Sequence, residues 1–401
     1  MKVLVIGGGA SGMMAALTAA EDPHNQVTLL ERQSRVGRKL LATGNGRCNL
    51  SNLHADVSHY HGQHPDFVQP AFNQFSVADT LAFFRSIGLL TVTEDSGKIY
   101  PFSDQSNSVV DVLRFALEQR GVHLCCSSEV QSIRKKARGY TVQTADDSYF
   151  GDKVIVACGG AAGGKLGGTD LGYRLLQSLG HSVTALHPSL VQMKTDVSAT
   201  RSLKGVRADA GILLKRNGKT VATNTGEVQF TDFGISGPAI FELSRQIADG
   251  GDMVLLLDFL RPYSQEEVLQ YLRDKQQAVP SLPLEEFLTG CLHNRLGRVI
   301  LKAAGFDLTR TVEALTEDEL VAICHHIKFF PLTVTGVMGL EQAQVTAGGV
   351  PTSEFRADTL ESRLAPNLYA TGEVLDIDGD CGGYNLQWAW SSGRLAGRLG
   401  K

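Results

Sequence analysis

The sequence predicts an α/β fold with a parallel sheet, interrupted by an inserted region that is first β-rich and then helical. A β-branched run from Lys2 to Ile6 leads directly into a glycine cluster and a helix-forming stretch, which is the order of a parallel strand, a turn and a helix. From about Val191 the pattern changes to hairpin and helix-capping signals. At roughly 100–200 residues a domain, the 401 residues allow two or three domains.

The first strand, turn and helix have the pattern of a dinucleotide-binding unit. Gly7 permits the tight turn, Gly9 allows the backbone to approach a pyrophosphate, and Gly12 allows the helix to pack closely on the strand. The helix N-terminus offers N–H groups and the positive end of its dipole to phosphates. Glu31 ends the next strand, where a carboxylate accepts hydrogen bonds from a ribose 2′-hydroxyl and disfavours NADP.

Two further glycine-rich segments distinguish a flavin site from an ordinary dehydrogenase. Arg38-Lys39 and the run from Thr43 to Asn49 could pack against a second phosphate or a flavin ring. Near the other end, a strand runs into Ala-Thr-Gly-Glu at residues 370–373. The glycines between 379 and 385 then precede a helix that we expect to start near Leu386. Its N-terminus could stabilise negative charge on a reduced flavin.

These motifs resemble the YhiN/BaiN family of FAD-dependent oxidoreductases, and the likeness covers essentially the whole chain, including the run from Phe230 to Pro238. The resemblance implies a Rossmann-like, two-dinucleotide-binding-domain fold that holds FAD. It also implies that Glu31 holds the adenosine ribose, that Gly372-Glu373 lies along the ribityl-pyrophosphate, and that residues 45–49 and 383–385 flank the isoalloxazine. In one departure, residues 41–43 lack a serine that relatives often carry. Names within the family cover enone reduction on steroid-like acids and amine oxidation.

The candidate cofactor-binding residues are Gly7, Gly9, Ala10, Ser11, Gly12, Glu31, Arg32, Arg38, Lys39, Gly44, Asn45, Arg47, Cys48, Asn49, Val130, Ala157, Gly159, Gly160, Gly372, Glu373, Gly383, Tyr384 and Asn385. The strand that ends in Ala157-Cys158-Gly159-Gly160 is expected to return the chain beside the FAD pyrophosphate. This segment is one residue short of a Walker A loop, because Leu166 stands where a Ser or Thr would bind Mg²⁺. Cys48 lacks a nearby second cysteine, so a structural or flavin-packing role is predicted for it.

The inserted region is expected to form a lid over the substrate. Asn217-Gly218 is a favoured hairpin turn, and Ser264-x-x-Glu267 and Thr316-x-x-Glu319 are capping boxes that open helices near 265–277 and 317–327. We therefore assign residues 1–190 to the first part of an FAD-binding domain, 191–262 to a β-rich insert, 263–330 to a helical subdomain, and 331–401 to the return strands and second part of the FAD-binding domain.

Charge and cysteine content bound the partners. The net charge of −4 provides no basic field for nucleic acid or an anionic membrane. Seven cysteines without a Cys-x-x-Cys pair predict neither a disulfide framework nor a metal site. The uncharged run from Val3 to Ala20 contains four glycines and fits a strand and helix better than a membrane span. A cytoplasmic enzyme with a small-molecule substrate is expected.

The predicted reaction is two-electron transfer through FAD, with the direction open. No second G-x-G-x-x-G follows a strand, so a dedicated NAD(P)H domain is not expected. Either NAD(P)H visits the flavin transiently, which makes a reductase, or an amine-type substrate reduces FAD and oxygen reoxidises it. An FAD- and folate-dependent RNA-modifying enzyme, disfavoured by the charge balance, and a non-catalytic flavin-binding protein are the alternatives. Cys48 and Tyr384 are acid–base candidates, and neither is assigned.

Overall fold

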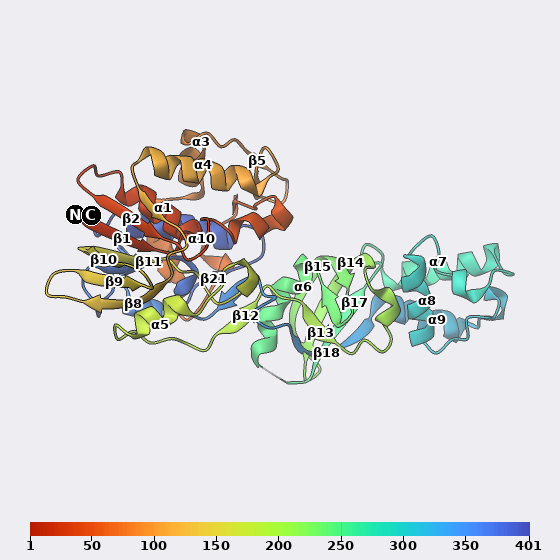
Figure 1. Ribbon diagram of the computed structural model, residues 1–401. Helices are drawn as coiled ribbons and strands as arrows, with labels where there is room; N and C mark the ends of the chain where they lie inside the picture. The colour runs from red at the N-terminus through yellow and green to blue at the C-terminus, as the bar shows by residue number, and fades with distance from the viewer. Residues whose placement is uncertain (250) are drawn as a thin grey trace. The chain divides into compact units, whose positions relative to one another are not determined.

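The computed structural model describes residues 1–249 and 251–401, which form two compact units (Figure 1). Unit 1 comprises Met1–Pro188 and Leu340–Lys401, and unit 2 comprises Ser189–Gly339. Each unit has its own cluster of buried hydrophobic residues. None of the helices in the described part of the chain is long and apolar enough to cross a membrane.

Unit 1 is built around a five-stranded sheet in which every neighbouring pair is parallel. The order is β20-β11-β1-β2-β7, with bounds β1 Lys2–Ile6, β2 Gln26–Leu30, β7 His123–Cys125, β11 Lys153–Val156 and β20 Leu368–Ala370. Residues Val3–Ile6 are all buried, because a parallel sheet is covered on both faces. The predicted α/β Rossmann-type fold is confirmed.

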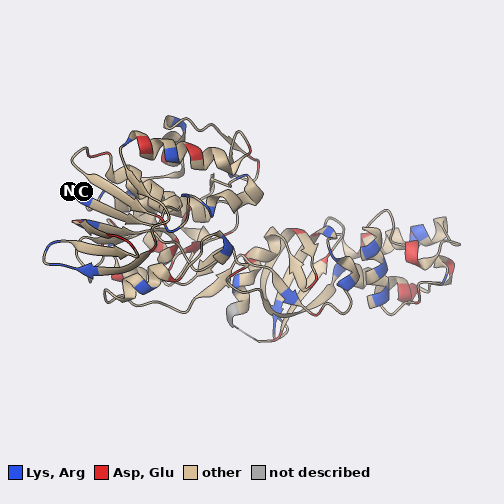
Figure 2. Cartoon of the chain, in the orientation of Figure 1, with Lys and Arg blue, Asp and Glu red and all other residues tan. Residues whose placement is uncertain are grey.

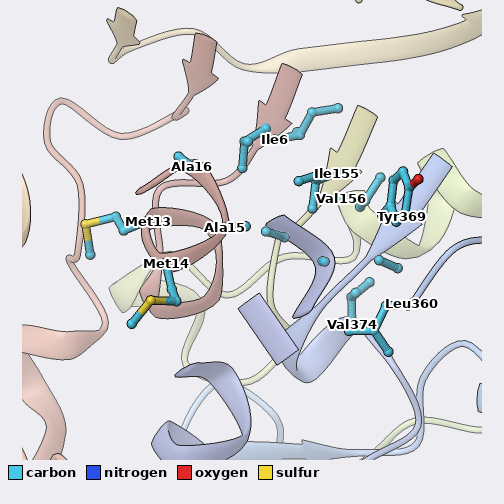
Figure 3. Packing of buried hydrophobic residues seen from close by; sticks show 14 of the residues in the cluster. Ile6, Met13, Met14, Ala15, Ala16, Ile155, Val156, Leu360, Tyr369 and Val374 are labelled. Carbon is cyan, nitrogen blue, oxygen red and sulfur yellow. The ribbon is translucent and has the colours of Figure 1, made fainter. Parts of the chain in front are cut away.

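One helix packs on this sheet, and a helix from the opposite end of the chain packs against it. They are α1 (Ala10–Ala19) and α10 (Tyr384–Gly397). Their backbones meet closely, because a Cβ on Gly393 would overlap the carbonyl oxygen of Ser11, and one on Gly397 would lie 2.6 Å from that of Ala15. Figure 3 shows the apolar side chains of α1 packed beside those of β1 and β11.

The other elements of unit 1 surround this core. The remaining helices are α2 Gln69–Gln74, α3 Val77–Ser86, α4 Ser106–Gln119 and α5 Leu171–Gln177. The remaining strands are β3 Ser51–Asn52, β4 Tyr60–His61, β5 Thr91–Thr93, β6 Lys98–Pro101, β8 Val130–Lys135, β9 Tyr140–Thr144, β10 Ser148–Gly151, β19 Val345–Ala347 and β21 Asp378–Gly379, with β12 (His187–Ser189) at the boundary of the units. β4 pairs with β21. This pairing joins residues more than three hundred positions apart, which matters for the site below.

Unit 2 contains a closed six-stranded barrel in the order β13-β16-β15-β14-β17-β18. Its strands are β13 Met193–Thr195, β14 Arg207–Arg216, β15 Lys219–Phe230, β16 Gly234–Ser236, β17 Met253–Asp258 and β18 Phe330–Val337. At the predicted hairpin turn Asn217 and Gly218 both have positive φ, 49° and 79°, as the favoured two-residue turn requires.

The helices of unit 2 are α6 Pro238–Leu243, α7 Gln265–Ala278, α8 Asn294–Ala303 and α9 Glu317–Lys328. Both predicted capping boxes are present, at Ser264 and Thr316. Barrel and helices share one hydrophobic core. The barrel also includes β18, whose alternate residues are buried in that core, so residues 330–339 belong to unit 2 and not to the segment that returns to unit 1. A strand pattern alone does not say which sheet a strand joins.

Candidate functional site

The turn between β1 and α1 is shaped by glycines with two different roles. A Cβ on Gly7, whose φ is +106°, would overlap the carbonyl oxygen of Ala157, and a Cβ on Gly12 would overlap the carbonyl oxygen of Gly7. A Cβ on Gly9 would meet no described atom within 4 Å. Gly9 is also the N-cap of α1, so it has no side chain with which to cap the first N–H groups of the helix. The turn therefore presents open space and helix-end N–H groups, which suit a phosphate.

Glu31 follows β2 and is held by the backbone of this turn. Its Oε2 accepts a hydrogen bond of 2.6 Å from the Gly8 N–H, and its Oε1 accepts one of 2.7 Å from the Gln33 N–H. Each carboxylate oxygen keeps a lone pair for a further donor. The carboxylate is thus oriented to accept ribose hydroxyls beside the glycine turn.

Two neighbours of Glu31 are placed differently. The guanidinium of Arg32 donates to the carbonyl oxygens of Gly167 and Gly168, at 2.9 and 3.3 Å, so the side chain ties down that loop. Val130 begins β8 and is buried. The Ser128 N–H donates to the carbonyl oxygen of Glu31 at 2.8 Å, which fixes the approach to β8 beside the carboxylate.

A second group of contacts connects Lys39, Gly160 and Glu373, which come from three separate segments of the chain. Nζ of Lys39 lies 2.9 Å from Oε2 of Glu373, whose Oε1 accepts from the Thr346 N–H at 2.9 Å. A Cβ on Gly160 would lie 2.6 Å from Oε1 of Glu373. A Cβ on Gly159, whose φ is +71°, would meet no described atom within 4 Å. Arg38 lies apart from this group.

Gly372 brings the C-terminal segment against the first turn of α1. Its φ is +76°, and a Cβ there would lie 2.6 Å from Oγ of Ser11. Its N–H donates to Oγ of Ser392 at 3.1 Å, and its carbonyl oxygen accepts from Nε1 of Trp388 at 3.3 Å. Arg38 donates to Oε1 of Gln33 at 2.6 Å, so its guanidinium is used near Glu31 and not near Gly372. Backbone and small side chains therefore form the wall next to Ala10 and Ser11.

The loop 43–49 has a run of left-handed residues. Gly44, Asn45, Gly46 and Cys48 have φ values of 57°, 56°, 88° and 61°. Cys48 is fully buried, and burial raises the pKa of its thiol to about 11, although a hydrogen bond with Thr43 opposes the shift. The thiol is therefore protonated near neutral pH, which favours the packing role predicted for it.

Side chains at the end of this loop have contrasting surroundings. The guanidinium of Arg47 pairs with Asp104, lies 3.1 Å from Oε1 of Glu94 and covers the ring of Tyr100 at 4.0 Å. Because its side chain holds the loop, Arg47 would contact a cofactor only through its backbone.

Asn49 is buried, and its Oδ1 has no hydrogen-bond partner among the described residues. A Cβ on Gly383 would lie 2.9 Å from that oxygen. Asn49 Oδ1 is thus an acceptor at the N-terminus of α10.

The N-terminus of α10 begins at Tyr384, two residues before the predicted start. Its N-cap, Gly383, has φ +101°. The amide of Asn385 closes the preceding turn, since its Oδ1 accepts from the Gly379 N–H at 2.8 Å and its Nδ2 donates to the Gly379 carbonyl oxygen at 2.7 Å. The Asn385 side chain therefore positions the turn that precedes the helix.

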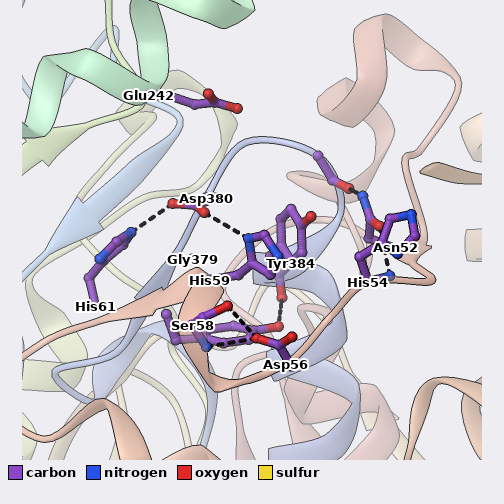
Figure 4. Close-up of polar contacts among 12 residues, drawn as sticks. Asn52, His54, Asp56, Ser58, His59, His61, Glu242, Gly379, Asp380 and Tyr384 are labelled. Atoms are coloured by element: carbon purple, nitrogen blue, oxygen red, sulfur yellow. Dashed lines mark hydrogen bonds and ion pairs between the residues drawn. The ribbon is translucent and has the colours of Figure 1, made fainter. Parts of the chain in front are cut away.

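Beside this helix end lies a His–Asp–His cluster that sequence reasoning missed (Figure 4). Nδ1 of His59 is 2.9 Å from Oδ2 of Asp380, and Nε2 of His61 is 2.7 Å from Oδ1 of the same carboxylate. The ring of His59 stacks on Tyr384 at 4.3 Å with an interplanar angle of 20°. A His-x-His pair, which places both rings on one face of a strand, was the available signal. Only the β4–β21 pairing shows that Asp380 is their partner.

The residues fit an FAD molecule. Gly9 leaves open space at the N-terminus of α1, the Glu31 carboxylate can accept from a ribose, and Asn49 Oδ1 can accept from an N–H group of a flavin ring. All of the candidate cofactor-binding residues lie in unit 1. Glu31 and Asn49 have acceptor capacity left for polar contacts, whereas the side chains of Lys39 and Glu373 pair with each other and those of Arg32, Arg38, Arg47 and Asn385 are used elsewhere within the protein.

The chain is similar to known proteins over nearly its full length. The family model described as "HI0933-like protein Rossmann domain" matches residues 1–399. The chain is 41% identical over 406 residues to 3-dehydro-bile acid delta(4,6)-reductase of Clostridium scindens, covering 99% of this chain and 98% of the relative. It is 29% identical over 392 residues to ribosomal RNA dihydrouridine synthase of Escherichia coli, covering 97% and 95%. The structure of 3-ketosteroid delta1-dehydrogenase from Sterolibacterium denitrificans shares the fold, with a TM-score of 0.51, 12% identity and coverage of 99% and 98%.

Proposed function

We propose that this protein reduces a carbon–carbon double bond conjugated to a carbonyl group. The chain belongs to the HI0933-like Rossmann family, and it is an FAD-dependent oxidoreductase that acts on a small organic substrate. The 41% identity to a delta(4,6)-reductase over nearly the full length of both chains is the observation that carries this proposal. The name of the second relative, a dihydrouridine synthase, supports it, because the C5=C6 bond of uracil is also conjugated to a carbonyl group.

The chain's own residues divide the work of binding. When bound and reduced, FAD supplies a hydride. The N-terminus of α1 would hold the pyrophosphate and Glu31 the adenosine ribose, and the Gly372-Glu373 segment would lie along the ribityl-pyrophosphate. The N-terminus of α10 would stabilise negative charge on the flavin ring, and Asn49 Oδ1 would orient that ring by accepting from an N–H group. We further propose that NADH or NADPH is a transient electron donor and that the enzyme is cytoplasmic.

A small molecule is a better candidate substrate than RNA. The helices of unit 2 carry both basic and acidic side chains (Figure 2), and three of their arginines pair with carboxylates. Arg310 lies 2.7 Å from Glu319, Arg273 donates to Glu317 at 2.9 Å, and Arg298 pairs with Glu286. Neutralised arginines provide a weak field for a phosphate backbone. This pattern supports a substrate of the enone class over ribosomal RNA.

Separate half-reactions test the proposal. The protein is reduced anaerobically with NADH, NADPH or dithionite, and then mixed with 3-oxo-Δ4 and 3-oxo-Δ4,6 steroid acids, simple α,β-unsaturated ketones, a uridine-containing ribosomal RNA fragment, or oxygen. We expect enones to restore the oxidised flavin absorbance, with a product that has gained two hydrogen atoms. If amines bleach the oxidised flavin while every enone leaves the reduced flavin unchanged, the protein is an oxidase and the proposal is wrong.

A further inference from the structure

The His–Asp–His cluster has two nitrogen atoms that its internal hydrogen bonds do not use. A carboxylate accepts hydrogen bonds, so each imidazole carries a hydrogen on the nitrogen that faces Asp380, Nδ1 in His59 and Nε2 in His61. Nε2 of His59 and Nδ1 of His61 are therefore the nitrogen atoms that do not contact Asp380. Among the described residues no group of three or more His, Cys, Asp or Glu side chains is arranged to hold a metal ion. Hydrogen bonding, and not metal ligation, accounts for this geometry.

A structural role does not explain the cluster. β4 and β21 are already joined by backbone pairing, and the Asp380 N–H donates to the carbonyl oxygen of His59 at 3.0 Å. The side chains of His59, His61 and Asp380 are 30%, 36% and 31% exposed. Hydrogen bonds between charged groups at that exposure contribute little to stability. The same exposure leaves the imidazoles open to a substrate and to water.

Other proton donors around the N-terminus of α10 are poorly suited. Cys48 is fully buried, with a thiol pKa of about 11. Tyr60 is buried and donates its hydroxyl to the carbonyl oxygen of Tyr384 at 2.8 Å, and burial raises its pKa well above the ordinary value. Neither group releases a proton readily near neutral pH. The imidazoles of the cluster remain, together with the Tyr384 hydroxyl, and of the two imidazoles it is that of His59 which stacks on Tyr384.

We propose that His59 donates the proton that completes the reduction, with Asp380 and Tyr384 as positioning residues. This inference rests on the proposed function. Asp380 remains an anion, because hydrogen bonds from His61 and His59 outweigh the effect of burial, which would raise its carboxyl pKa, and lower that pKa overall. The Asp380 carboxylate, 2.9 Å from Nδ1, and the stacking on Tyr384 together fix the orientation of the His59 ring.

The step is balanced in atoms and electrons. A hydride from the reduced cofactor forms a C–H bond at the β carbon of the substrate, and the double-bond electrons move toward the carbonyl oxygen to give an enolate. The Nε2–H bond of His59 then breaks as a C–H bond forms at the α carbon. The cofactor loses two electrons, the double bond gains them, and neutral His59 takes a new proton from water.

The test compares the two half-reactions in His59→Gln, Asp380→Asn and the control His54→Gln. His54 is exposed and its side chain lies outside the cluster. We expect His59→Gln to bind FAD with the wild-type stoichiometry and to be reduced by NADH or dithionite at a rate within about twofold of wild type. Its reoxidation by the enone should slow by ~100-fold or more, in the range of general acid catalysis. Asp380→Asn should show the same selective loss, and His54→Gln none.

Deuterium labelling gives a readout apart from rate and cofactor content. In D₂O the wild-type product should carry deuterium on one face of the α carbon, and residual product from His59→Gln should lose this preference. If the enone reoxidises wild type and His59→Gln at the same rate, the inference about His59 is wrong while the proposed function stands. If His59→Gln and Asp380→Asn both lose FAD, or if both half-reactions slow together, the cluster is structural and the inference is wrong. If no enone reoxidises wild type, the proposed function itself fails, and the inference fails with it.

Discussion

At the scale of single residues, the glycines of the N-terminal turn belong to one sequence motif but are needed for two different reasons. Gly12 is required by the protein itself, since a Cβ would overlap the carbonyl oxygen of Gly7. Gly9 is not, since no described atom lies within 4 Å of the position that a Cβ would take. The space around Gly9 is therefore kept for the cofactor, and the two positions should respond differently to the same substitution.

Gly12→Ala should destabilise the protein, whereas Gly9→Ala should leave it stable and weaken FAD binding. We expect Gly12→Ala to lower the free energy of unfolding of the FAD-free protein by about 1–3 kcal/mol or more, because a methyl group is forced against the backbone. Thermal denaturation without FAD and absorbance titration with FAD measure the two effects. Equal loss of stability in both variants would contradict the distinct roles.

Glu31→Gln should weaken FAD binding without unfolding the turn. The amide oxygen of Gln can still accept from one of the two backbone N–H groups, but its NH2 group cannot accept from the other, and the charge that strengthens hydrogen bonds from ribose hydroxyls is lost. We expect the dissociation constant of FAD to rise about tenfold, which corresponds to about 1.4 kcal/mol. The matched control is Glu129→Gln, an exposed carboxylate 3.8 Å from Arg32, which should bind FAD as wild type does. Unchanged affinity in Glu31→Gln would remove the ribose role.

At the scale of elements, side chains link segments that the chain order separates. His181 is buried, and its Nδ1 lies 2.7 Å from Oε2 of Glu354 while its Nε2 lies 2.9 Å from Oγ of Ser362. Its ring stacks on Phe355 at 4.7 Å. The order Ser–His–Glu resembles a hydrolase triad, but Ser362 is buried and its Oγ also accepts from the Ala365 N–H at 2.9 Å. These hydrogen bonds and the ring stacking connect residues 181–182 to the segment 354–362.

Glu354→Gln should lower stability in a pH-dependent way. Burial alone would raise the pKa of Glu354, but hydrogen bonds from Ser182 and His181 outweigh it and lower that pKa. A carboxyl group whose pKa is lower in the folded than in the unfolded protein stabilises the fold above its unfolded value of about 4.3, and this contribution is lost as the pH falls through the folded value.

We therefore expect Glu354→Gln to lower the free energy of unfolding by about 1–3 kcal/mol at pH 7, with a smaller difference from wild type below about pH 4. Thermal denaturation across this pH range measures it. Glu118→Gln, which removes an exposed carboxylate paired with Arg114 at 2.9 Å, is the control and should change stability by less than about 0.5 kcal/mol. A constant difference at all pH values would rule out the carboxylate as the cause.

At the scale of the whole molecule, cofactor binding is expected to belong to one unit. Unit 1 contains all of the candidate cofactor-binding residues and the His–Asp–His cluster, and it has its own hydrophobic core. Unit 2 has a closed barrel, with no open sheet edge to complete, and a separate core. The two segments of unit 1 can therefore keep their packing when the chain between them is replaced.

Replacing residues 189–339 with a flexible Gly-Ser linker should yield a yellow protein that still binds FAD. We expect about one FAD per chain and reduction by dithionite, because the candidate cofactor-binding residues all lie in unit 1. Absorbance titration and rapid mixing measure these properties, with the full chain purified in parallel. A soluble, folded product that takes up no FAD would show that unit 2 contributes to the cofactor site.

The sequence by itself determined the local parts of this protein. The β1-turn-α1 unit, the Asn217-Gly218 hairpin and the capping boxes depend on residues within a few positions of one another, where φ preference, periodicity and capping act directly. The tertiary structure alone decided which distant segments meet. It assigned β18 to the barrel, used Arg47 in an internal ion-pair network, and brought Asp380 to His59 and His61 through the β4–β21 pairing. The physical reason is that such partners are chosen by long-range packing and sheet pairing, which have no signature in the residues around each position.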